Sequence, residues 1–563
     1  MKEEKKQVTV ERVWKEYEKG VQFKQQLNLY DTVKVNEDFY IGKQWEGVQS
    51  NGLPTPVFNY IKRIILYLVA STATDNLKIN ASPLASTGQL PEEQTEQLCS
   101  VVNTQFEAVY EQTKAGKLVR EFMRAAAVDG DSCIYSWFDP SVETGQTARG
   151  AIRAEILENT RVVFGNPNTG DVQSQPYIIV SRREMLDTVK EEAKANGEDP
   201  DQIISDTDET NDHFDAMTDG KVTTLVRFWK EGGTVRAIKT VQGSTVRKEW
   251  DTGLKLYPIA WMSWDKVTGC YHGQAAVTGL IPNQVFVNKM FAMTMISLMT
   301  TAYPKVIYDR TRISRWDSGV GKAIGVDLGS GSINDVAKTV DPAVISPQVS
   351  QFIELAINLT KEFNGATDAA LGNVKPDNTS AIIALQKASG VPMELTKQDL
   401  YQCLEDVGRI WIDIMRAYYG QRFVELPLTE QERKMVMAQG VNIDSKTVAF
   451  DFGLLEQVPL SIKLDVGGSA YWSEIAQLNT LDNLLVQGKI DVIDYLERVP
   501  AGYISNQQEL IDTLKERQAA AMSAAAPGGP ITPQSAKGLD PMLTAGQETY
   551  ERKALEQGAA NLI

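Results

Sequence analysis

Histidine and cysteine, the side chains most often used in nucleophilic, acid–base and zinc chemistry, are scarce in this sequence. The 563 residues include two histidines, His213 and His272, and four cysteines without CxxC spacing: Cys99, Cys133, Cys270 and Cys403. Neither histidine has a serine, cysteine or carboxylate partner at a diagnostic spacing. Scattered cysteines argue against a zinc site and fit a reducing compartment. Carboxylates are abundant, but no pair stands out as an acid–base couple. We therefore expect no catalytic centre, no metal site and no cofactor.

Two glycine-rich segments resemble nucleotide-binding loops only superficially. In "GVGKAIG", residues 319–325, Trp316 stands where a P-loop requires its first glycine, and Ala323 stands where it requires serine or threonine. The segment "LGSGS", residues 328–332, lacks the strand and helix that flank a dinucleotide-binding loop. Both segments are predicted to be turns or loops.

Charge is concentrated in two short segments. The acidic "DTDETNDHFD", residues 206–215, lacks the glycine and terminal glutamate of an EF-hand, so we interpret the insertion 197–220 as a solvated surface loop. The basic "YDRTRISRW", residues 308–316, places Arg310, Arg312 and Arg315 near two aromatic residues. It is either the charged rim of a hairpin or a docking surface for a partner protein or for phosphate.

The net charge of −16 argues against a protein that coats DNA, because such binding relies on Lys and Arg neutralising phosphates. An acidic surface is compatible with a protein that touches DNA without holding it. The two most apolar segments, 57–76 and 285–303, contain charged residues and fall short of the about 20 apolar residues that span a bilayer. With a charged N-terminus that lacks an apolar signal core, the expectation is a soluble, cytoplasmically made chain of several packed units without a membrane anchor.

The elements of the first half are predicted to be mixed helix and strand. Charged helix is expected up to about residue 45, and a second helix within 57–76 has a predicted buried face of Ile61, Ile64, Ile65, Leu68 and Thr72, with Lys62 and Arg63 at its edge. A helix from Pro91 should bury Leu98, Val102, Phe106 and Val109, and another runs from Lys117 to Gly130. Short β-rich runs between Ser132 and Trp264 predict seven strands, with a helix at 183–195 among them.

A long helical pattern begins at Gly273 and contains Pro282, which should kink it. Its predicted stripe is Val277, Leu280, Ile281, Val285, Phe291, Met295 and Met299. Four methionines between 290 and 299 make an adaptable packing surface. The helix is either an ordinary core helix or one that packs against copies of itself in a ring.

The second half is predicted to continue with a compact segment, a returning helix and a loop of small and polar residues. A broken helix then runs to Tyr419, with a predicted seam of Leu400, Leu404, Val407, Trp411, Ile414 and Tyr418. A strand-like passage over 448–468 and further short helices follow, two of them opened by capping boxes at Thr429 and Ser505. A low-complexity tail ends the chain.

This order of parts resembles the portal proteins of tailed bacteriophages over about residues 39–521. The resemblance rests on "FYIGKQW…LPTPVFNYIKRII…NLKINASP", on "AAAVDGDSCIYSWFD…ILENTRVVFGNP", on "PIAWMSWDKVTGCYHGQAAVTGLIPNQVFVNKM" and on "ATDAALGNVKPDNTSAIIALQKAS". It implies an α+β, predominantly helical portal fold. The parts are an N-terminal segment and α/β wing (1–272), a first stem helix (273–302), a small α/β clip (303–345), a second stem helix (346–364), a tunnel loop (365–378), a broken helix with the wing return (379–465), a helical crown (466–521) and a tail (522–563).

The resemblance also implies a function. Portal proteins form a dodecameric ring at one capsid vertex of the virion, assembled in the host cytoplasm, and double-stranded DNA passes non-specifically through the ring during packaging and ejection. The implied clip residues for docking the terminase large subunit, and later head-completion or adaptor proteins, are Arg310, Arg312, Arg315, Trp316 and Lys322. The implied tunnel-loop residues are Gly365, Asp368, Asn373, Lys375, Asp377 and Asn378. Scaffolding and major capsid proteins would contact the outer wing.

Two other classes of protein fit the sequence less well. A metal-dependent nucleic-acid-processing enzyme would need a carboxylate motif that we do not recognise. A different structural head–tail connector component would not need the succession of helix, clip, helix, loop and helix.

Overall fold

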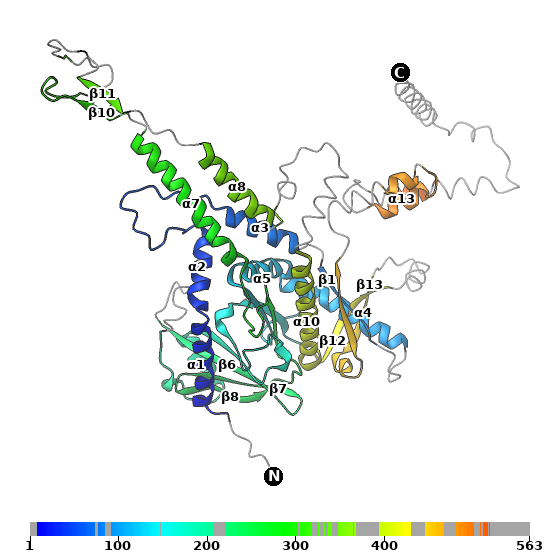
Figure 1. The fold of residues 1–563 in the computed structure, drawn as a ribbon. Helices are drawn as coiled ribbons and strands as arrows, with labels where there is room; N and C mark the ends of the chain where they lie inside the picture. Colours follow the sequence, from blue (N-terminus) through cyan, green and yellow to red (C-terminus); the bar gives the residue numbers. More distant parts are fainter. Residues whose placement is uncertain are drawn as a thin grey trace, which may run out of the picture. The chain divides into compact units, whose positions relative to one another are not determined.

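The computed structural model describes residues 8–73, 77–84, 92–146, 148–207, 220–301, 305–317, 325–326, 332, 336–340, 347–363, 365–366, 393–428, 445–466, 480–485, 487–499, 507, 510–515 and 517. The chain divides into two compact units, residues 1–467 and 468–563. Figure 1 traces the chain. Both helices and small sheets are present, so the predicted α+β class is confirmed.

The N-terminal helical region consists of two helices rather than one. Helix α1 (Val10–Gln26) is capped by Thr9, whose hydroxyl accepts from the backbone N–H of Arg12, and α2 (Leu29–Ile41) follows after Asn28. Asn28 adopts a left-handed conformation with φ of 54°, which interrupts the helical path. Gly20 lies against the sheet, where a Cβ would overlap Val163, so α1 approaches β4 closely only because this residue is glycine.

The helices of the core follow the predicted apolar faces. In α3, all five predicted residues are buried while Lys62 and Arg63 are exposed. In α4, all four predicted residues are buried. The other α-helices in the described part of the chain are α3 (Tyr60–Thr72), α4 (Glu92–Gln112), α5 (Ala115–Asp129), α6 (Leu186–Ala195), α7 (Ala276–Thr301), α8 (Pro347–Phe363), α10 (Glu394–Tyr418) and, in the second unit, α13 (Val492–Arg498).

Two antiparallel sheets form the β part of the first unit. One has the strand order β3-β2-β9 and the other β4-β5-β6-β7-β8. The strands are β2 (Asp131–Asp139), β3 (Ala151–Leu157), β4 (Val162–Phe164), β5 (Ile178–Met185), β6 (Lys221–Glu231), β7 (Thr234–Val241), β8 (Ser244–Asp251) and β9 (Ile259–Ser263). All seven predicted strands are therefore present. Strand β8 was not predicted, and α6 begins three residues later than expected because β5 extends to Met185.

Three two-stranded sheets complete the β structure. They pair β1 (Leu77–Pro83) with β14 (Leu460–Val466), β10 (Lys305–Tyr308) with β11 (Ala337–Val340), and β12 (Gln421–Pro427) with β13 (Ser445–Asp451). In the first sheet, Leu77 pairs with Val466, which joins two distant parts of the chain. Short 3-10 helices are η1 (Asn159–Arg161), η2 (Val172–Ser174), η3 (Pro200–Gln202) and η7 (Phe452–Glu456).

Helix α10 is the central element of the main core. Five of its six predicted seam residues are buried, and Trp411 donates its indole N–H to Ser136 Oγ at 3.1 Å. Tyr418, the sixth, was wrongly predicted to be buried: it is 39% exposed and stacks on Phe138 with the ring centroids 4.9 Å apart. Tyr418 continues the helical spacing of the seam, but it is the last residue of α10 and therefore lies at the edge of the core.

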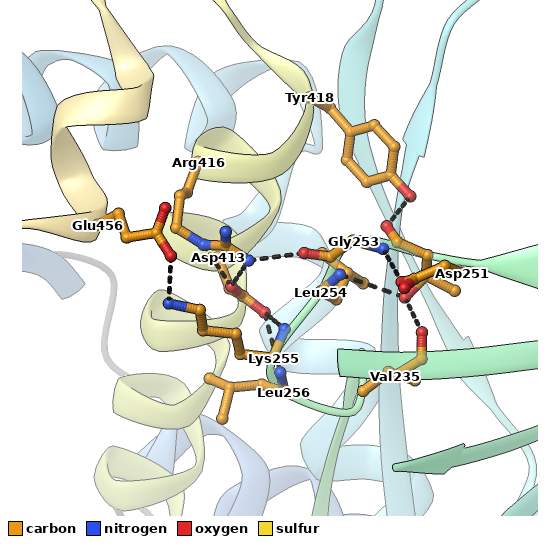
Figure 2. A network of polar contacts seen from close by, with 11 residues as sticks. Val235, Asp251, Gly253, Leu254, Lys255, Leu256, Asp413, Arg416, Tyr418 and Glu456 are labelled. Carbon is orange, nitrogen blue, oxygen red and sulfur yellow. Dashed lines mark hydrogen bonds and ion pairs between the residues drawn. The ribbon is translucent and has the colours of Figure 1, made fainter. Parts of the chain in front are cut away.

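A polar network fixes α10 to the connection between β8 and β9 (Figure 2). One carboxylate oxygen of Asp413 accepts from the backbone N–H groups of Lys255 at 2.6 Å and Leu256 at 2.9 Å. The other oxygen accepts from Arg416, whose guanidinium also donates to the carbonyl of Gly253. Both carboxylate oxygens of Asp413 accept hydrogen bonds. This buried side chain therefore holds the connection between β8 and β9 in one position on α10.

Several predicted features lie outside the described residues. These are residues 208–219 of the acidic insertion, which include His213, the glycine-rich segments except Gly325 and Ser332, both capping boxes, the first part of the broken helix and the C-terminal tail. Among the described helices, none is long and apolar enough to cross a membrane. The described part of the chain contains no cluster of three His, Cys, Asp or Glu side chains that could hold a metal ion.

Candidate functional site

Helices α7 and α8 form an antiparallel hairpin. Asn283, in the first half of α7, donates to the hydroxyl of Thr360 near the end of α8 at 3.1 Å. Phe286, one turn further along α7, meets Phe352 near the start of α8 in an edge-on contact with the centroids 6.1 Å apart. Figure 1 shows the two helices side by side.

The inner face of α7 is partly polar. Gln284 and Asn288 are both fully buried, and Gln284 donates to the carbonyl of Phe58 at 2.8 Å and to Asn288 Oδ1 at 3.0 Å. Asn288 donates to Gln44 Oε1 at 2.6 Å. These amides bind the segment between α2 and α3, and burying them is tolerated because each finds a hydrogen-bond partner. The i, i+4 spacing of two amides inside an apolar helix is the sequence signal that would have identified this face.

The C-terminal half of α7 exposes several large apolar side chains. Of the predicted stripe, Val277 and Leu280 are buried and Ile281, Val285 and Phe291 are partly buried, whereas Met299 is 65% exposed and Met295 is also exposed. The alternative of an ordinary core helix therefore fails for these two methionines, and the alternative of packing against other copies stays a prediction. The exposed apolar face, as we call it below, comprises Phe286, Met293, Met295, Leu298 and Met299 of α7 and Phe352, Leu355 and Leu359 of α8.

This exposed apolar face has a physical cost. Each large aliphatic side chain gains about 1.5–3 kcal/mol when it moves from water to an apolar environment. Isolated apolar residues are common on protein surfaces, but eight exposed large apolar side chains on two adjacent helices indicate a candidate interaction site. Helix α7 contains one charged residue, Lys289, so its part of the face can accept an apolar partner with little desolvation of charge, whereas α8 carries Glu354, Lys361 and Glu362.

The strands β10 and β11, with the basic segment, connect the far ends of the hairpin helices. A turn capped by Asp309 orders the basic segment: its carboxylate accepts from the backbone N–H of Thr311 at 2.8 Å, and the Thr311 hydroxyl lowers the pKa of Asp309. Ile313 is buried, and Tyr308 stacks on Trp316 with the centroids 5.7 Å apart.

The three arginines of this segment are exposed, and Arg312 forms an ion pair with Asp309 at 3.6 Å. The stack of Tyr308 on Trp316 closes the segment, so Arg310, Arg312 and Arg315 lie in one ordered turn. The turn is therefore a preformed cationic surface. Lys322, the fifth predicted residue of this group, lies outside the described residues.

Only the start of the predicted tunnel loop lies within the described residues. Gly365 is left-handed with φ of 68° and donates to the carbonyl of Glu362 at 3.0 Å, which ends α8. Ala366 is fully buried in the same core as α3 and the start of α7. The other predicted residues, Asp368, Asn373, Lys375, Asp377 and Asn378, lie outside the described residues.

His272 has a carboxylate partner that was missed in the sequence. Its Nδ1 lies 2.8 Å from Asp131 Oδ2, while Asp131 Oδ1 accepts from the backbone N–H of Gly273 at 2.8 Å. The partner is 141 positions away, so no local spacing could reveal it. Burial lowers the pKa of His272, opposed by Asp131. Because the ring is enclosed by Tyr271 and Trp261, the pair has the character of a structural anchor for the start of α7.

A buried lysine anchors α1 in a similar way. The ammonium of Lys24 donates to the carbonyls of Asn159, Thr160 and Val162 at 2.9, 2.8 and 2.7 Å. Burial lowers the pKa of Lys24 to about 7, and Asp131 opposes this shift. All three ammonium hydrogens are used, so Lys24 ties α1 to η1 and β4 and is not positioned to react.

Comparison with known families identifies the class of protein to which this hairpin belongs. A family model described as phage P22-like portal protein matches residues 248–545, more than half of the chain. The chain belongs to the P22-like phage portal family. No curated protein matched the sequence.

The family match covers the hairpin, β10, β11, the predicted tunnel loop and α10. It confirms the resemblance to tailed-phage portal proteins that the order of parts indicated. Portal proteins are structural components of the virion, so the family places the chain among structural proteins.

Proposed function

We propose that copies of this chain assemble into a ring at one capsid vertex, and that double-stranded DNA enters and leaves the capsid through this ring. The observation that carries the proposal, together with the family, is the exposed apolar face of α7 and α8. A chain that folds with polar amides inward and methionines outward on the same helix is poorly suited to remain alone in water.

The proposed ring is a dodecamer, the number that the family resemblance implies. Its contact with DNA would be weak and non-specific, since a chain with net charge −16 offers few cations to neutralise phosphates. The tunnel-loop residues Gly365, Asp368, Asn373, Lys375, Asp377 and Asn378 are proposed to line the narrowest part of the channel.

The cationic turn is the proposed docking surface for the terminase large subunit and, later, for head-completion or adaptor proteins. Its support is the ordered presentation of Arg310, Arg312 and Arg315 around the stacked Trp316. Planar guanidinium groups suit acidic partner surfaces because they bind carboxylates in a bidentate manner. Scaffolding and major capsid proteins are proposed to bind elsewhere on the first unit.

Ring formation is tested by negative-stain electron microscopy and native mass spectrometry of the purified chain. Closed rings with a central hole are expected. The double variant Leu298→Glu with Met299→Glu is expected to remain monomeric, because two charges would be buried at the contact. The matched control is Ile204→Glu, at a residue that is 77% exposed on another part of the chain, and it should still form rings.

A wild-type chain that stays monomeric across concentration and salt would contradict the proposal. Assays for Mg²⁺-dependent cleavage of nucleic acid would then test the competing enzyme class.

Docking at the cationic turn is tested separately on preformed rings. Replacing Arg310, Arg312 and Arg315 together by alanine should leave the ring intact and abolish binding of the purified terminase large subunit in pull-down assays. A variant with lysine at all three positions keeps the positive charge. If it binds the terminase more weakly than the wild type but more strongly than the alanine variant, the loss relative to the wild type is due to the missing guanidinium geometry. Full binding by the alanine variant would exclude this turn as the docking surface.

A further inference from the structure

The segment between α2 and α3, residues 42–58, presents apolar side chains to solvent. Val48 and Leu53 are each 54% exposed, and Phe58 is 48% exposed. Lys43 and Glu46 are the only charged residues in the segment. A connection of this length with so little charge and so much exposed apolar surface is unusual for a solvent-facing loop. We refer to residues 42–58 as the arm.

Internal hydrogen bonds hold the arm in a defined shape. The indole of Trp45 donates to the carbonyl of Pro56 at 3.0 Å, which joins the two ends of the arm. Within it, the backbone N–H of Leu53 donates to Ser50 at 2.9 Å, and that of Val48 donates to Trp45 at 3.1 Å. An ordered arm loses little conformational entropy when it binds, so its exposed side chains are prepared for a partner.

The base of the arm is fixed to α7. Gln44, at the start of the arm, accepts from Asn288, and the carbonyl of Phe58, at its end, accepts from Gln284. The Phe58 ring also packs on Phe291 with the centroids 4.1 Å apart. The arm and the hairpin therefore present apolar surface from one continuous support, and Val48 and Leu53 are each 54% exposed.

A ring built from identical subunits uses a heterologous interface, in which one surface of a subunit meets a different surface of its neighbour. Two such surfaces are available on this chain: the arm and the exposed apolar face. Both carry exposed large apolar side chains, with Lys43 and Glu46 as the charged residues of the arm and Lys289, Glu354, Lys361 and Glu362 as those of the two helices, so apolar surface of one can be buried against apolar surface of the other. We propose that the arm of one copy docks on the exposed apolar face of α7 and α8 in the next copy. This inference rests on the proposed ring and identifies the residues that would join its subunits.

Photo-crosslinking from the tip of the arm tests the contact directly. A benzoylphenylalanine replaces Leu53, the purified assembly is irradiated, and the products are separated on a denaturing gel and mapped by mass spectrometry. Crosslinks between chains, at the mass of two or more chains and mapped to residues 276–301 or 347–363, are expected. Crosslinks confined to a single chain, or mapped between chains to other segments, would overturn the inference.

The same sample, viewed by electron microscopy, separates this inference from the function on which it rests. Absence of rings in the wild type would contradict the proposed function itself. Intact rings without crosslinks from arm to hairpin would reject the arm contact alone.

A pair of variants provides the quantitative test. Val48→Asp with Leu53→Asp should reduce the fraction of chains in rings by about tenfold or more, because two charges would face an apolar surface. Ile204→Asp, at an exposed apolar residue that belongs to neither surface, is the control and should leave the fraction unchanged. Circular dichroism of the monomers checks that the arm variant is folded. Unchanged ring formation by a folded arm variant would overturn the inference.

Discussion

Helices α3 and α7 pack in the same hydrophobic core, but they distribute their apolar residues in opposite ways. In α3, isoleucine and leucine side chains fill the core, and the charged Lys62 and Arg63 lie outside. In α7, the rule holds only in part. Val287 is buried, but Gln284 and Asn288 also face inward, while Met293, Met295 and Met299 are exposed.

The difference shows what apolar periodicity measures. A periodic stripe identifies the surface that a helix buries in its working state, whether the partner is the same chain or another molecule. For α3 the partner is the same chain, so the predicted face and the buried face coincide. For α7 the stripe combined residues that face two directions, and the chain by itself covers one of them.

The largest expected effect tests the α3 side of this comparison. Ile65→Ala should lower the free energy of unfolding by about 2–5 kcal/mol, since Ile65 is fully buried and its removal leaves a cavity. Leu66→Ala, at the neighbouring residue that is 53% exposed, should change it by less than about 0.5 kcal/mol. Urea denaturation followed by tryptophan fluorescence measures both. Similar losses for the two variants would contradict the assigned buried face.

The inner polar face of α7 should give the next largest effect. Asn288→Leu keeps the side-chain size but leaves Gln44 without its donor, so we expect a loss of about 1–3 kcal/mol in the same measurement. Lys289→Leu is the matched control, because this adjacent residue is exposed. If both variants are equally stable, the amides do not hold the arm on the helix.

The anchor at the start of α7 should make stability depend on pH. Burial lowers the pKa of His272 below its usual value, so the unfolded chain takes up a proton more readily than the folded chain. This contribution of His272 to the free energy of unfolding is complete above about pH 6.5, the usual pKa of histidine, and is lost progressively as the pH falls below it, at no more than about 1.4 kcal/mol per pH unit.

His272→Asn should flatten this dependence, since an amide can donate to Asp131 but does not titrate. The test is to measure the free energy of unfolding of both proteins between pH 5 and 7 and to compare the two slopes against pH. An equally steep profile in the variant would assign the dependence to other groups.

The smallest expected effect lies at the exposed end of α7. Met299→Gln should change the free energy of unfolding of the monomeric chain by less than about 0.5 kcal/mol, because the side chain already contacts water. Val287→Gln, on the same helix but fully buried, should instead destabilise the chain by more than about 2 kcal/mol. A large loss for Met299→Gln would mean that the chain itself covers this residue.

Local patterns accounted for most of the secondary structure. The faces of α3 and α4, the extent of α8 and the strands from β2 to β7 and β9 follow from periodicity and turn residues. Strands β1, β8, β11 and β12 were not predicted. Strand β1, for example, forms only because β14 pairs with it at the other end of the first unit, and a short run has no stable strand conformation without its partner.

The candidate site divides in the same way. The cationic turn could be located from the residues of 308–316 because its members are neighbours in sequence. The pairing of His272 with Asp131, and the attachment of the arm to Gln284 and Asn288, depend on contacts across more than a hundred positions.

By itself, the sequence determined which segments form helices, where charge and apolar residues concentrate, and the order of parts that is typical of a portal protein. These properties arise from interactions between near neighbours along the chain, which composition and spacing record directly. Only the tertiary structure decided which side chains of α7 its own chain covers and which remain exposed. The physical reason is that burial depends on which distant surface arrives at a helix, and an apolar side chain gains the same free energy whether that surface belongs to its own chain or to another.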